Sequence, residues 1–555
     1  MRIAIAQVNP IVGDLAGNRA LVEDAAARAA DAGAELVVLP ELVLTGYPPM
    51  DLLERRGFVR DQLAQLDALR PASQRVAIAL GAVIPASGGR RAGADEPFDA
   101  LWNAAVVLAR GEIVAVRAKT LLPTYDVFDE KRYFEPASVR EPFRLPASDT
   151  TLGVAICEDS WAEEMEYDVD PVSELQWGGA RIVLNPSASP WHVGKPAERR
   201  AMLARLAQRC GLAIVFANQV GGNDELVFDG GSFVVDAQGQ VRAQLPLFEP
   251  AFAVVDVPGE GAGTPLAEVA DPSGVEQLES GLVLGIRDYF EKQKLPPGAV
   301  IGLSGGIDSA VTAHLAALAL GPERVLGIAM PGPFSSEHSI ADAHELGRLL
   351  GIEVRTVDIT PVFDAYRLLF AQLFGERADY GLTQQNIQSR IRGATLMAVS
   401  NEESRLVLAT GNKSELSVGY CTLYGDTVGG IAVLGDVYKR DVYALAHHAN
   451  RAAPRIPKGS IEKPPSAELA PNQLDTDDLP PYDVLDAVLA QAIEGELGRE
   501  SIVAPPGATA EAARAIVRRL DRNEYKRRQT PLVLRTSRKA FGSGRRLPIV
   551  HRYEG

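Results

Sequence analysis

The chain has 555 residues and a formal charge of −16, from 56 basic and 72 acidic residues. This length favours two large domains or three ordinary ones, whose cores need no cross-links. The negative charge argues against a general nucleic-acid or anionic-membrane binder, because both surfaces would repel the chain.

Three widely separated cysteines, Cys157, Cys210 and Cys421, suggest neither a disulfide framework nor a zinc site. They fit a reducing cytoplasm. The N-terminal stretch lacks the length and cleavage site of a signal peptide, so we expect it to form a buried strand. No apolar run reaches the length of a membrane span.

Short apolar strands alternate with amphipathic helices in the first half of the sequence. This alternation predicts a layered α/β domain. The predicted strands are 3–8, 35–39, 76–83, 104–108, 113–118, 152–156, 181–184, 213–217 and 232–235, and the predicted helices are 18–32 and 196–210.

A segment rich in glycine and proline follows, and it predicts a linker over 258–274. We therefore expect one domain over 1–257 and another over 275–555. The second opens with a helix at 275–293 and continues as a doubly wound parallel sheet, which binds ligands at the carboxyl ends of its strands. Its predicted strands are 299–303, 325–330 and 353–358, its helices 309–320 and 338–350, and its acidic, proline-rich loop 458–481.

Three polar residues of the first half, Glu41, Lys119 and Cys157, each follow an apolar strand. A thiolate is a nucleophile, a nearby cation lowers the pKa of a thiol, and a carboxylate can accept its proton. The ammonium can also stabilise a developing oxyanion. Taken singly, each has an ordinary interpretation, with Cys157 as a small core residue and the other two as a solvated ion pair.

Together the three resemble the nitrilase, or carbon–nitrogen hydrolase, superfamily. Its motifs stand here as Leu39-Pro-Glu41, Lys119-Thr-Leu-Leu-Pro123 and Cys157-Glu-Asp-Ser-Trp161. Over residues 1–257 the resemblance implies a four-layer αββα sandwich. It also implies that Glu41 is the base, that Lys119 supports the oxyanion and that Cys157 is the nucleophile.

The same resemblance implies a second acidic residue near the site, for which Glu130 is the candidate and Asp129 the alternative. In the glutamine-hydrolysing members it also implies a glutamine pocket, although loop chemistry alone would account for the tyrosine and the serines. The residues implied for this pocket are Tyr125, Glu158, Lys195 and Ser189, with Ser187 as the alternative to Ser189.

A Gly-rich turn joins strand 299–303 to the next helix. The run Ser304-Gly-Gly-Ile-Asp-Ser309 offers close backbone approach, helix N-terminal amides for phosphate, hydroxyl donors, and an aspartate for Mg²⁺. It lacks the lysine of a Walker A loop and is typical of ATPases that release pyrophosphate. The predicted ATP contacts of the turn are Gly302, Leu303, Ser304, Gly305, Gly306, Ile307, Asp308 and Ser309.

Residues 275–555 resemble the ligase domain of the glutamine-dependent NAD⁺ synthetases, and the run 218–231 is also typical of that family. The ligase motifs lie at 385–392, 408–415, 424–426, 438–440, 463–469 and 525–526. The resemblance implies ATP contacts at Thr410, Lys439 and Ser466, deamido-NAD⁺ contacts at Asn386, Glu415 and Lys526, and Mg²⁺ at Asp308 and Glu415.

Some of these positions have another interpretation or depart from the family. Arg390 and Arg392 could form a solvated helix face, and Lys526 belongs to a basic surface run. Ammonia-dependent relatives often have His-Lys where Tyr525-Lys526 stands, and lysine where Leu423 stands.

The two halves predict one net reaction. Glutamine is hydrolysed to glutamate and ammonia, ATP with Mg²⁺ adenylates deamido-NAD⁺, and ammonia then gives NAD⁺ and AMP. We hypothesise a protected ammonia path, because protonation in bulk water destroys the nucleophile. The resemblance implies a homo-oligomer, a dimer or an octamer. Alternatives are another amidotransferase with the same ATP loop and an amidase with an ATP-sensing module. A scaffold protein with dead sites predicts damaged motifs, which this sequence does not have.

Overall fold

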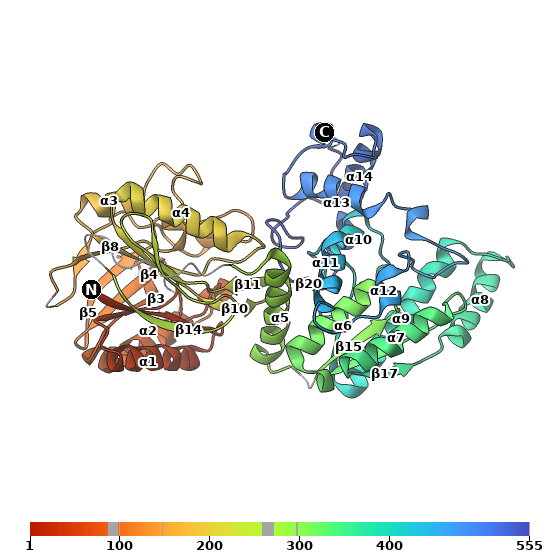
Figure 1. The fold of residues 1–555 in the computed structure, drawn as a ribbon, viewed down its shortest axis with the longest axis horizontal. Coiled ribbons are helices and arrows are strands. Elements are labelled where there is room, and N and C mark those ends of the chain that lie inside the picture. The colour runs from red at the N-terminus through yellow and green to blue at the C-terminus, as the bar shows by residue number, and fades with distance from the viewer. Residues whose placement is uncertain (87–97, 99, 147, 258–270, 296–297, 554–555) are drawn as a thin grey trace. The chain divides into compact units, whose positions relative to one another are not determined.

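The computed structural model (Figure 1) describes residues 1–86, 98, 100–146, 148–257, 271–295 and 298–553. The chain divides into two compact units, Met1–Asp271 and Pro272–Gly555. Most of the predicted linker at 258–274 lies outside the described residues. No helix in the described part of the chain is long and apolar enough to cross a membrane.

The first unit contains two six-stranded sheets. One runs in the order β14 (Ala251–Asp256), β1 (Arg2–Gln7), β2 (Leu36–Val38), β3 (Ala77–Pro85), β4 (Leu101–Ala109) and β5 (Glu112–Ala118). The other runs in the order β13 (Val241–Gln244), β12 (Phe233–Val235), β9 (Ala213–Asn218), β8 (Ile182–Ser187), β7 (Thr151–Val154) and β6 (Phe143–Arg144). A hairpin of β10 (Val220–Asn223) and β11 (Leu226–Asp229) stands apart.

Helices cover the outer face of each sheet (Figure 1). Alternate residues of β1 face opposite sides, so that Ile3 packs between the sheets and Ala4 packs under the helices. The first sheet packs against α1 (Leu15–Asp31) and α2 (Phe58–Ala68). The second sheet packs against α3 (Pro171–Trp177) and α4 (Lys195–Cys210). The expected four-layer αββα sandwich is therefore confirmed.

The second unit is built on a six-stranded, wholly parallel sheet. Its order is β17 (Glu353–Thr356), β16 (Val325–Ala329), β15 (Gly298–Leu303), β18 (Arg405–Ala409), β19 (Ile431–Ala432) and β20 (Leu532–Val533). The strand order reverses between β15 and β18, which makes the carboxyl ends of these strands a ligand-binding crevice. The expected doubly wound fold is confirmed.

Helices and connections complete the second unit. They are α5 (Gly274–Lys292), α6 (Ile307–Leu320), α7 (Glu337–Leu350), α8 (Thr360–Phe374), α9 (Leu382–Glu403), α10 (Lys413–Val418), α11 (Lys439–Ala449), α12 (Lys458–Glu462), α13 (Tyr482–Ile493), α14 (Ala510–Arg522) and α15 (Glu524–Arg527).

Most predicted boundaries differ from the observed ones by one to three residues, and two differences affect the second unit's loops. The helix expected from residue 309 begins at Ile307, so Asp308 and Ser309 lie in its first turn. The segment 458–481 is not loop throughout, because α12 occupies Lys458–Glu462. Pro457 precedes that helix, and a Lys458–Glu462 ion pair of 3.4 Å spans its single turn.

Candidate active sites

The segments that follow β2 and β5 bring Glu41, Lys119 and Glu130 into one buried cluster. The Lys119 Nζ atom lies 2.7 Å from Glu41 Oε1 and 2.8 Å from Glu130 Oε1. The side chains of Glu41 and Lys119 are at most 1% exposed. Burial alone would lower the pKa of Lys119, but the Glu130 and Glu41 carboxylates raise it well above its ordinary value. The amine is therefore held as an ammonium without contact with solvent.

Uncharged groups also donate hydrogen bonds to these carboxylates. Asn103 Nδ2 donates to Glu41 Oε1 at 2.7 Å and to Glu130 Oε2 at 3.3 Å. The Tyr47 hydroxyl donates to Glu130 Oε1 at 2.8 Å, and the Ala188 backbone N–H donates to Glu41 Oε2 at 3.0 Å. Burial raises the pKa of Glu130 to about 7, against the opposing effect of Lys119. Glu130 can thus hold a proton near neutral pH.

The Cys157 thiol lies close enough to this cluster to sense its charges. Burial and the Glu41 charge raise the pKa of Cys157 well above its ordinary value, while Lys119 opposes them. The expected lowering by a cation is therefore outweighed, and the resting group is a thiol. A thiol of this kind needs a base to remove its proton as it attacks, and Glu41 is near enough for its charge to raise the thiol pKa.

Cys157 stands in a constrained turn after β7. Its φ of 42° lies in the left-handed region, which costs a non-glycine residue on the order of 1–3 kcal/mol. Asp159 stabilises the turn by accepting from the backbone N–H groups of Ile156 at 3.0 Å and Leu121 at 2.7 Å. Because Leu121 follows Lys119 closely, the same carboxylate joins the thiol turn to the lysine segment. We name Glu41, Lys119, Glu130 and Cys157 the cysteine site.

The Glu41 backbone depends on a close approach to β3. Leu42 has a φ of 45°, and Gly81 of β3 lies directly against it. A Cβ atom on Gly81 would overlap the Leu42 nitrogen and the Glu41 carbonyl carbon. Only glycine fits at this point, so Gly81 sets the position of the Glu41 carboxylate.

Two of the residues expected in a glutamine pocket contact each other beside Cys157. The Tyr125 hydroxyl donates to Glu158 Oε1 at 3.0 Å, and the Tyr167 hydroxyl donates to the same oxygen at 3.1 Å. Burial raises the pKa of Glu158 and lowers the pKa of Lys195 to about 8. The Lys195 ammonium lies 3.9 Å from the centre of the Trp161 ring.

The two serine candidates differ in their surroundings. Ser189 is held through its backbone N–H, which donates to Asn218 Oδ1 at 2.9 Å. Ser187 instead uses its hydroxyl, which donates to Asn185 Oδ1 at 3.2 Å. Ser187 is fully buried and occupied by that contact, so Ser189 is the better candidate for a ligand.

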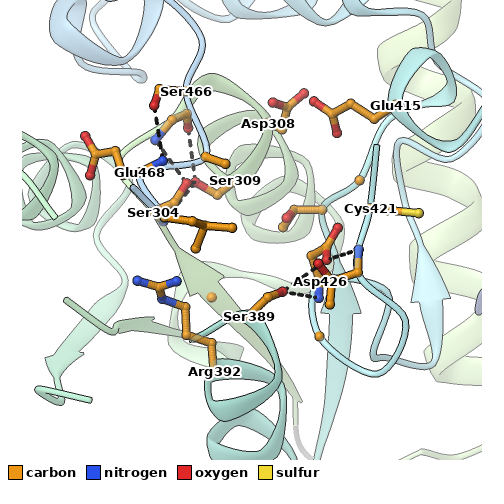
Figure 2. Close-up of a pocket in the computed structure, with 18 of the residues that line it drawn as sticks. Ser304, Asp308, Ser309, Ser389, Arg392, Glu415, Cys421, Asp426, Ser466 and Glu468 are labelled. Atoms are coloured by element: carbon orange, nitrogen blue, oxygen red, sulfur yellow. Dashed lines mark hydrogen bonds between the residues drawn. The ribbon is translucent and has the colours of Figure 1, made fainter. Parts of the chain in front are cut away.

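The second unit contains a cavity of about 540 Å³ at the carboxyl ends of β15 and β18, which we name the loop pocket (Figure 2). Thirteen of the fourteen residues expected to contact nucleotides line it, and Gly305 is the exception. The thirteen are Gly302, Leu303, Ser304, Gly306, Ile307, Asp308, Ser309, Asn386, Thr410, Glu415, Lys439, Ser466 and Lys526.

The Gly-rich turn enters the loop pocket between β15 and α6. Gly305 has a φ of 73°, and a Cβ atom there would overlap the Ser339 backbone, so it must be glycine. The Ser304 hydroxyl accepts from the Gly306 N–H at 3.2 Å, and Ser309 Oγ lies 3.3 Å from Ser304 Oγ. The turn therefore presents backbone N–H groups and hydroxyls at a helix N-terminus, an arrangement that binds phosphate.

Two carboxylates and one ammonium meet at the rim of this turn. Lys439 Nζ lies 2.5 Å from Asp308 Oδ2 and 3.3 Å from Glu415 Oε1, and Figure 2 shows the two carboxylates facing each other. Asn412 Nδ2 donates to Asp308 Oδ1 at 2.9 Å. Burial lowers the pKa of Lys439, but the Asp308 and Glu415 charges raise it above its ordinary value overall. Burial raises the pKa of Glu415 to about 8, so this carboxyl binds a proton readily.

The remaining expected contacts lie on other walls of the loop pocket. Asn386 Oδ1 accepts from the Thr422 hydroxyl at 2.9 Å. Lys526 donates to the backbone carbonyls of Gly419 and Cys421, each at 2.7 Å, so it is not a free surface lysine. The Ser466 hydroxyl donates to a backbone carbonyl at 2.5 Å.

Comparisons with known proteins agree with this geometry. The carbon-nitrogen hydrolase family model matches residues 2–264, and the NAD synthase family model matches residues 279–530. The glutamine-dependent NAD(+) synthetase of Synechocystis is 43% identical, with 99% of each chain covered. The chain belongs to the family of glutamine-dependent NAD(+) synthetases. The Thermotoga maritima member is 40% identical over all of this chain and 99% of its own.

A solved member of the family has the same fold. The glutamine-dependent NAD(+) synthetase from Acinetobacter baumannii, determined in complex with adenosine diphosphate, is 36% identical. It covers 99% of this chain and 98% of its own, with a TM-score of 0.76.

Several polar residues that surround the cysteine site of this member of the NAD(+) synthetase family were not predicted from the sequence. Asn103 lies inside an apolar strand and Tyr47 in a loop, so neither follows a strand as the catalytic candidates do. Asp159 belongs to the quoted cysteine motif, but its part in joining two segments is visible only in three dimensions. A buried amide amid the apolar residues of β4 was the one available signal.

The loop pocket also contains polar residues outside the predicted set. Asp426 accepts from Ser389 Oγ at 3.1 Å and from the Thr422 N–H at 2.7 Å (Figure 2). Arg392 lines the pocket and donates to the Met330 carbonyl at 3.0 Å, so it does not belong to a solvated helix face. Burial lowers the pKa of Arg392 to about 10.

Replacing Gly81 with alanine tests whether the cysteine site depends on the Glu41 turn. We expect Gly81→Ala to reduce the kcat/KM of glutamine hydrolysis ~100-fold, because the turn must move and small displacements cost that much. Ammonia-dependent synthesis should change little. In the control Gly153→Ala, the added methyl group would lie 3.1 Å from Leu175 Cδ1 and 3.3 Å from the Cβ atoms of Leu175 and Ala180, so the neighbours need to shift by only a few tenths of an ångström. Equal hydrolysis losses in the two variants would contradict the prediction.

The lowered pKa of Lys195 predicts a pH dependence of glutamine use. The ammonium is charged below a pH of about 8 and neutral above it, so the contact expected of Lys195 with the carboxylate of glutamine would be lost as pH rises. We expect the KM for glutamine, measured by glutamate release across about pH 6.5 to 9.5, to rise above that value. Lys195→Arg should remove this rise, because arginine stays charged. An unchanged rise in the variant would assign it to another group.

Proposed function

We propose that this chain transfers the amide nitrogen of glutamine to deamido-NAD⁺. In the net reaction glutamine gives glutamate, ATP gives AMP and pyrophosphate, and deamido-NAD⁺ gives NAD⁺. The observation that carries the proposal is the presence of both sites in one chain, aligned over 99% of its length with a glutamine-dependent NAD(+) synthetase. The adenosine diphosphate in the Acinetobacter baumannii member supports a nucleotide as a ligand of the loop pocket.

In the first half-reaction, Cys157 attacks the glutamine amide carbon. Glu41 accepts the thiol proton and passes a proton to the departing nitrogen, so that ammonia leaves and a thioester forms. Lys119 stabilises the oxyanion with an ammonium that is already desolvated and needs no reorganisation. Water, activated by Glu41, then hydrolyses the thioester to glutamate. Glu130 keeps Lys119 charged and in place.

The glutamine main chain is the part that distinguishes this substrate from a simple amide. We assign its binding to Tyr125, Glu158, Ser189 and Lys195. Glu158 suits the α-ammonium group when it is ionised, and Lys195 suits the α-carboxylate. The tyrosine hydroxyl holds Glu158 in place at 3.0 Å.

In the second half-reaction, the Gly-rich turn holds the ATP phosphates while the nicotinate carboxylate attacks the α-phosphorus. Pyrophosphate leaves, and ammonia then displaces AMP from the adenylated carboxylate. Lys439 lies where charge develops on the departing pyrophosphate. Thr410 and Ser466 are assigned to ATP, and Asn386, Glu415 and Lys526 to deamido-NAD⁺.

Asp308 and Glu415 are the residues that would hold a Mg²⁺ ion. The described residues contain no cluster of three acidic, histidine or cysteine side chains that could hold a metal. Mg²⁺ is commonly bound by one or two carboxylates together with phosphate and water oxygens, so this pair is sufficient. When bound, Mg²⁺ would neutralise phosphate charge. Lys439 forms ion pairs with both carboxylates.

The assay that tests this function supplies glutamine, ATP, Mg²⁺ and deamido-NAD⁺, and measures NAD⁺, AMP and glutamate. We expect all three products, and no AMP when deamido-NAD⁺ is omitted. AMP and a new amide formed only with a different carboxylate acceptor would assign the chain to another amidotransferase reaction. Glutamate formed without AMP under every condition would leave only an amidase. We further expect a cytoplasmic homo-oligomer, which the family resemblance implies.

A further inference from the structure

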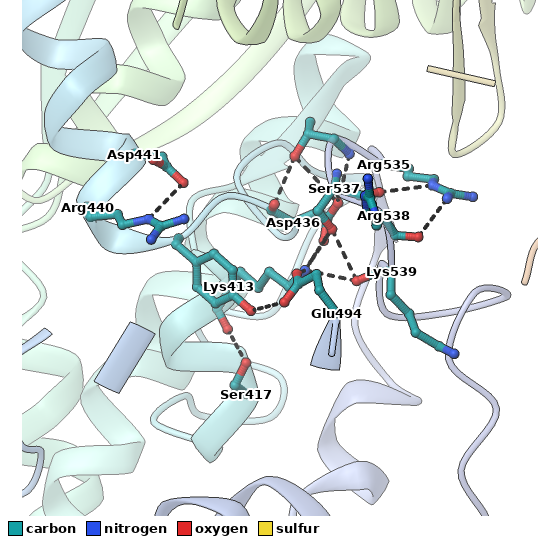
Figure 3. Close-up of polar contacts among 12 residues, drawn as sticks. Lys413, Ser417, Asp436, Arg440, Asp441, Glu494, Arg535, Ser537, Arg538 and Lys539 are labelled. Carbon is teal, nitrogen blue, oxygen red and sulfur yellow. Dashed lines mark hydrogen bonds and ion pairs between the residues drawn. The ribbon is translucent and has the colours of Figure 1, made fainter. Parts of the chain in front are cut away.

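A buried ammonium outside the loop pocket joins several segments of the second unit. Lys413 begins α10, and its side chain is 0% exposed. Its Nζ atom lies 2.7 Å from Asp436 Oδ1, 2.6 Å from Glu494 Oε1, 2.8 Å from Ser537 Oγ and 2.9 Å from the Lys539 carbonyl (Figure 3). Four acceptors surround a group with three protons, so its hydrogen-bonding capacity is filled.

The partners of Lys413 come from three separate parts of the chain. Asp436 stands three residues before Lys439, on the connection from β19 to α11. Glu494 directly follows α13, and Ser537 follows β20. Lys413 itself stands two residues before Glu415. One ammonium therefore holds together the two segments that carry Glu415 and Lys439.

The C-terminal segment is bound to this ammonium through Asp436 as well as directly. Asp436 Oδ2 accepts from the backbone N–H groups of Thr536 and Ser537, each at 2.7 Å. Asp436 Oδ1 accepts from the Ser537 hydroxyl at 2.9 Å in addition to Lys413. These partners lie 100 or more positions apart in the sequence, and Thr536 and Ser537 lie beyond the NAD synthase match, which ends at residue 530.

Two hydrogen bonds from backbone N–H groups connect the start of α10 to the segment that leads into α11. The Lys413 N–H donates to the Val437 carbonyl at 2.9 Å. The Lys439 N–H donates to the Ser414 hydroxyl at 2.9 Å, and Ser414 in turn donates to Asp486 at 2.5 Å. The first turn of α10 and the first turn of α11 are thus linked residue by residue.

Removal of the Lys413 ammonium would leave Asp436 and Glu494 without their cation. Asp436 is buried, with a side chain 0% exposed, and an uncompensated buried carboxylate either draws in water or moves apart from its neighbours. Both responses shift Asp436. Because Asp436 stands only three residues before Lys439, the first residue of α11, we expect the Lys439 side chain to move relative to Glu415.

We propose that Lys413 is a positioning residue of the synthetase reaction, and that the segment 536–539 is part of the same device. Lys413 sets the separation of Glu415 from Lys439, and the C-terminal segment closes the charged cluster that keeps Lys413 in place. The inference rests on the proposed function, since Glu415 and Lys439 serve it as contacts of ATP, Mg²⁺ and deamido-NAD⁺. It goes beyond that function by assigning a role to residues that do not line the loop pocket.

The test compares Lys413→Met with Lys292→Met. Lys292 is 12% exposed, pairs with Asp288 on α5 and does not line the loop pocket, so its loss removes a largely buried ammonium that lies outside the pocket. Thermal unfolding curves of both variants are measured first, and the assays are run at a temperature where both are folded. There we expect Lys413→Met to lower ammonia-dependent kcat/KM for ATP ~100-fold and to raise the Mg²⁺ requirement, as a misplaced contact would. Lys292→Met and the glutamate-releasing activity of both variants should match the parent protein.

A milder variant keeps the test decisive if Lys413→Met does not fold. Ser537→Ala removes one hydroxyl from the cluster and leaves every charge. We expect a loss of about tenfold in the same kcat/KM, without loss of glutamate release. Parent values for the folded variants, or an equal loss in Lys292→Met, would overturn the proposal. If the parent protein makes NAD⁺, the proposed function holds whatever the variants do. If the parent protein makes none, both the proposed function and the inference about Lys413 fail.

Discussion

Cys157→Ala should abolish glutamine-dependent NAD⁺ synthesis and leave ammonia-dependent synthesis intact. The thiol is the only proposed nucleophile of the cysteine site, and loss of a nucleophile typically lowers kcat by about 10⁵–10⁶-fold, to background. The variant should fold, because cysteine to alanine removes a single buried atom. The measurement is NAD⁺ formation with glutamine and, separately, with an ammonium salt at saturation.

The matched control for that variant is Cys210→Ala. Cys210 ends α4 and is also buried, but its Sγ lies 3.7 Å from the Ser173 hydroxyl and has no contact with the cysteine site. It should retain both activities. If Cys157→Ala also lost ammonia-dependent synthesis while remaining folded, the proposed division of labour between the two sites would be wrong.

Lys439→Met should give the opposite pattern. Both glutamine-dependent and ammonia-dependent synthesis should fall together, by roughly 10²–10³-fold, because one preorganised charge is removed from the place where pyrophosphate departs. Glutamate release should persist. The loss also leaves Asp308 and Glu415 facing each other without a cation, so we expect tighter Mg²⁺ binding in the absence of ATP.

Lys458→Met serves as the control for this second variant. Its side chain is 83% exposed and its partner is a surface glutamate, so all activities should be retained. The informative quantity is the ratio of the two synthetic activities in Lys439→Met. A fall in glutamine-dependent synthesis alone would place Lys439 in ammonia transfer and would contradict its assignment to ATP.

Local pattern was enough to predict the alternating strands and helices and the phosphate-binding turn, whereas the four layers and the roles of the reactive groups were predicted from the family resemblance. Ile3 and Ala4 alternate between two cores as period-two strands require, and Cys157 comes three residues after the end of β7, so both positions could be read from neighbouring residues. The turn at 304–309 was readable for the same reason, since all its donors lie within six consecutive positions. A site whose groups all lie in one short segment can be predicted from the sequence of that segment.

Contacts between distant segments were not readable. Asn103 bridges Glu41 and Glu130 from the middle of an apolar strand, 62 and 27 positions away. Lys413 meets Ser537 across 124 positions, and nothing near either residue indicates the other. The start of α6 was also misjudged by two residues, because Ile307 and Asp308 already adopt helical geometry in the phosphate-binding turn. Such features arise from tertiary packing, which a local pattern does not encode.

The central claim is that one nitrogen atom passes from glutamine to the dinucleotide through two sites in one chain. The most direct measurement supplies glutamine labelled with ¹⁵N in its side-chain amide, with ATP, Mg²⁺ and deamido-NAD⁺, and determines the mass of the NAD⁺ formed. We predict one ¹⁵N atom in the carboxamide of each NAD⁺, with one glutamate and one AMP. Glutamate and AMP formed while NAD⁺ is absent or unlabelled would contradict the account.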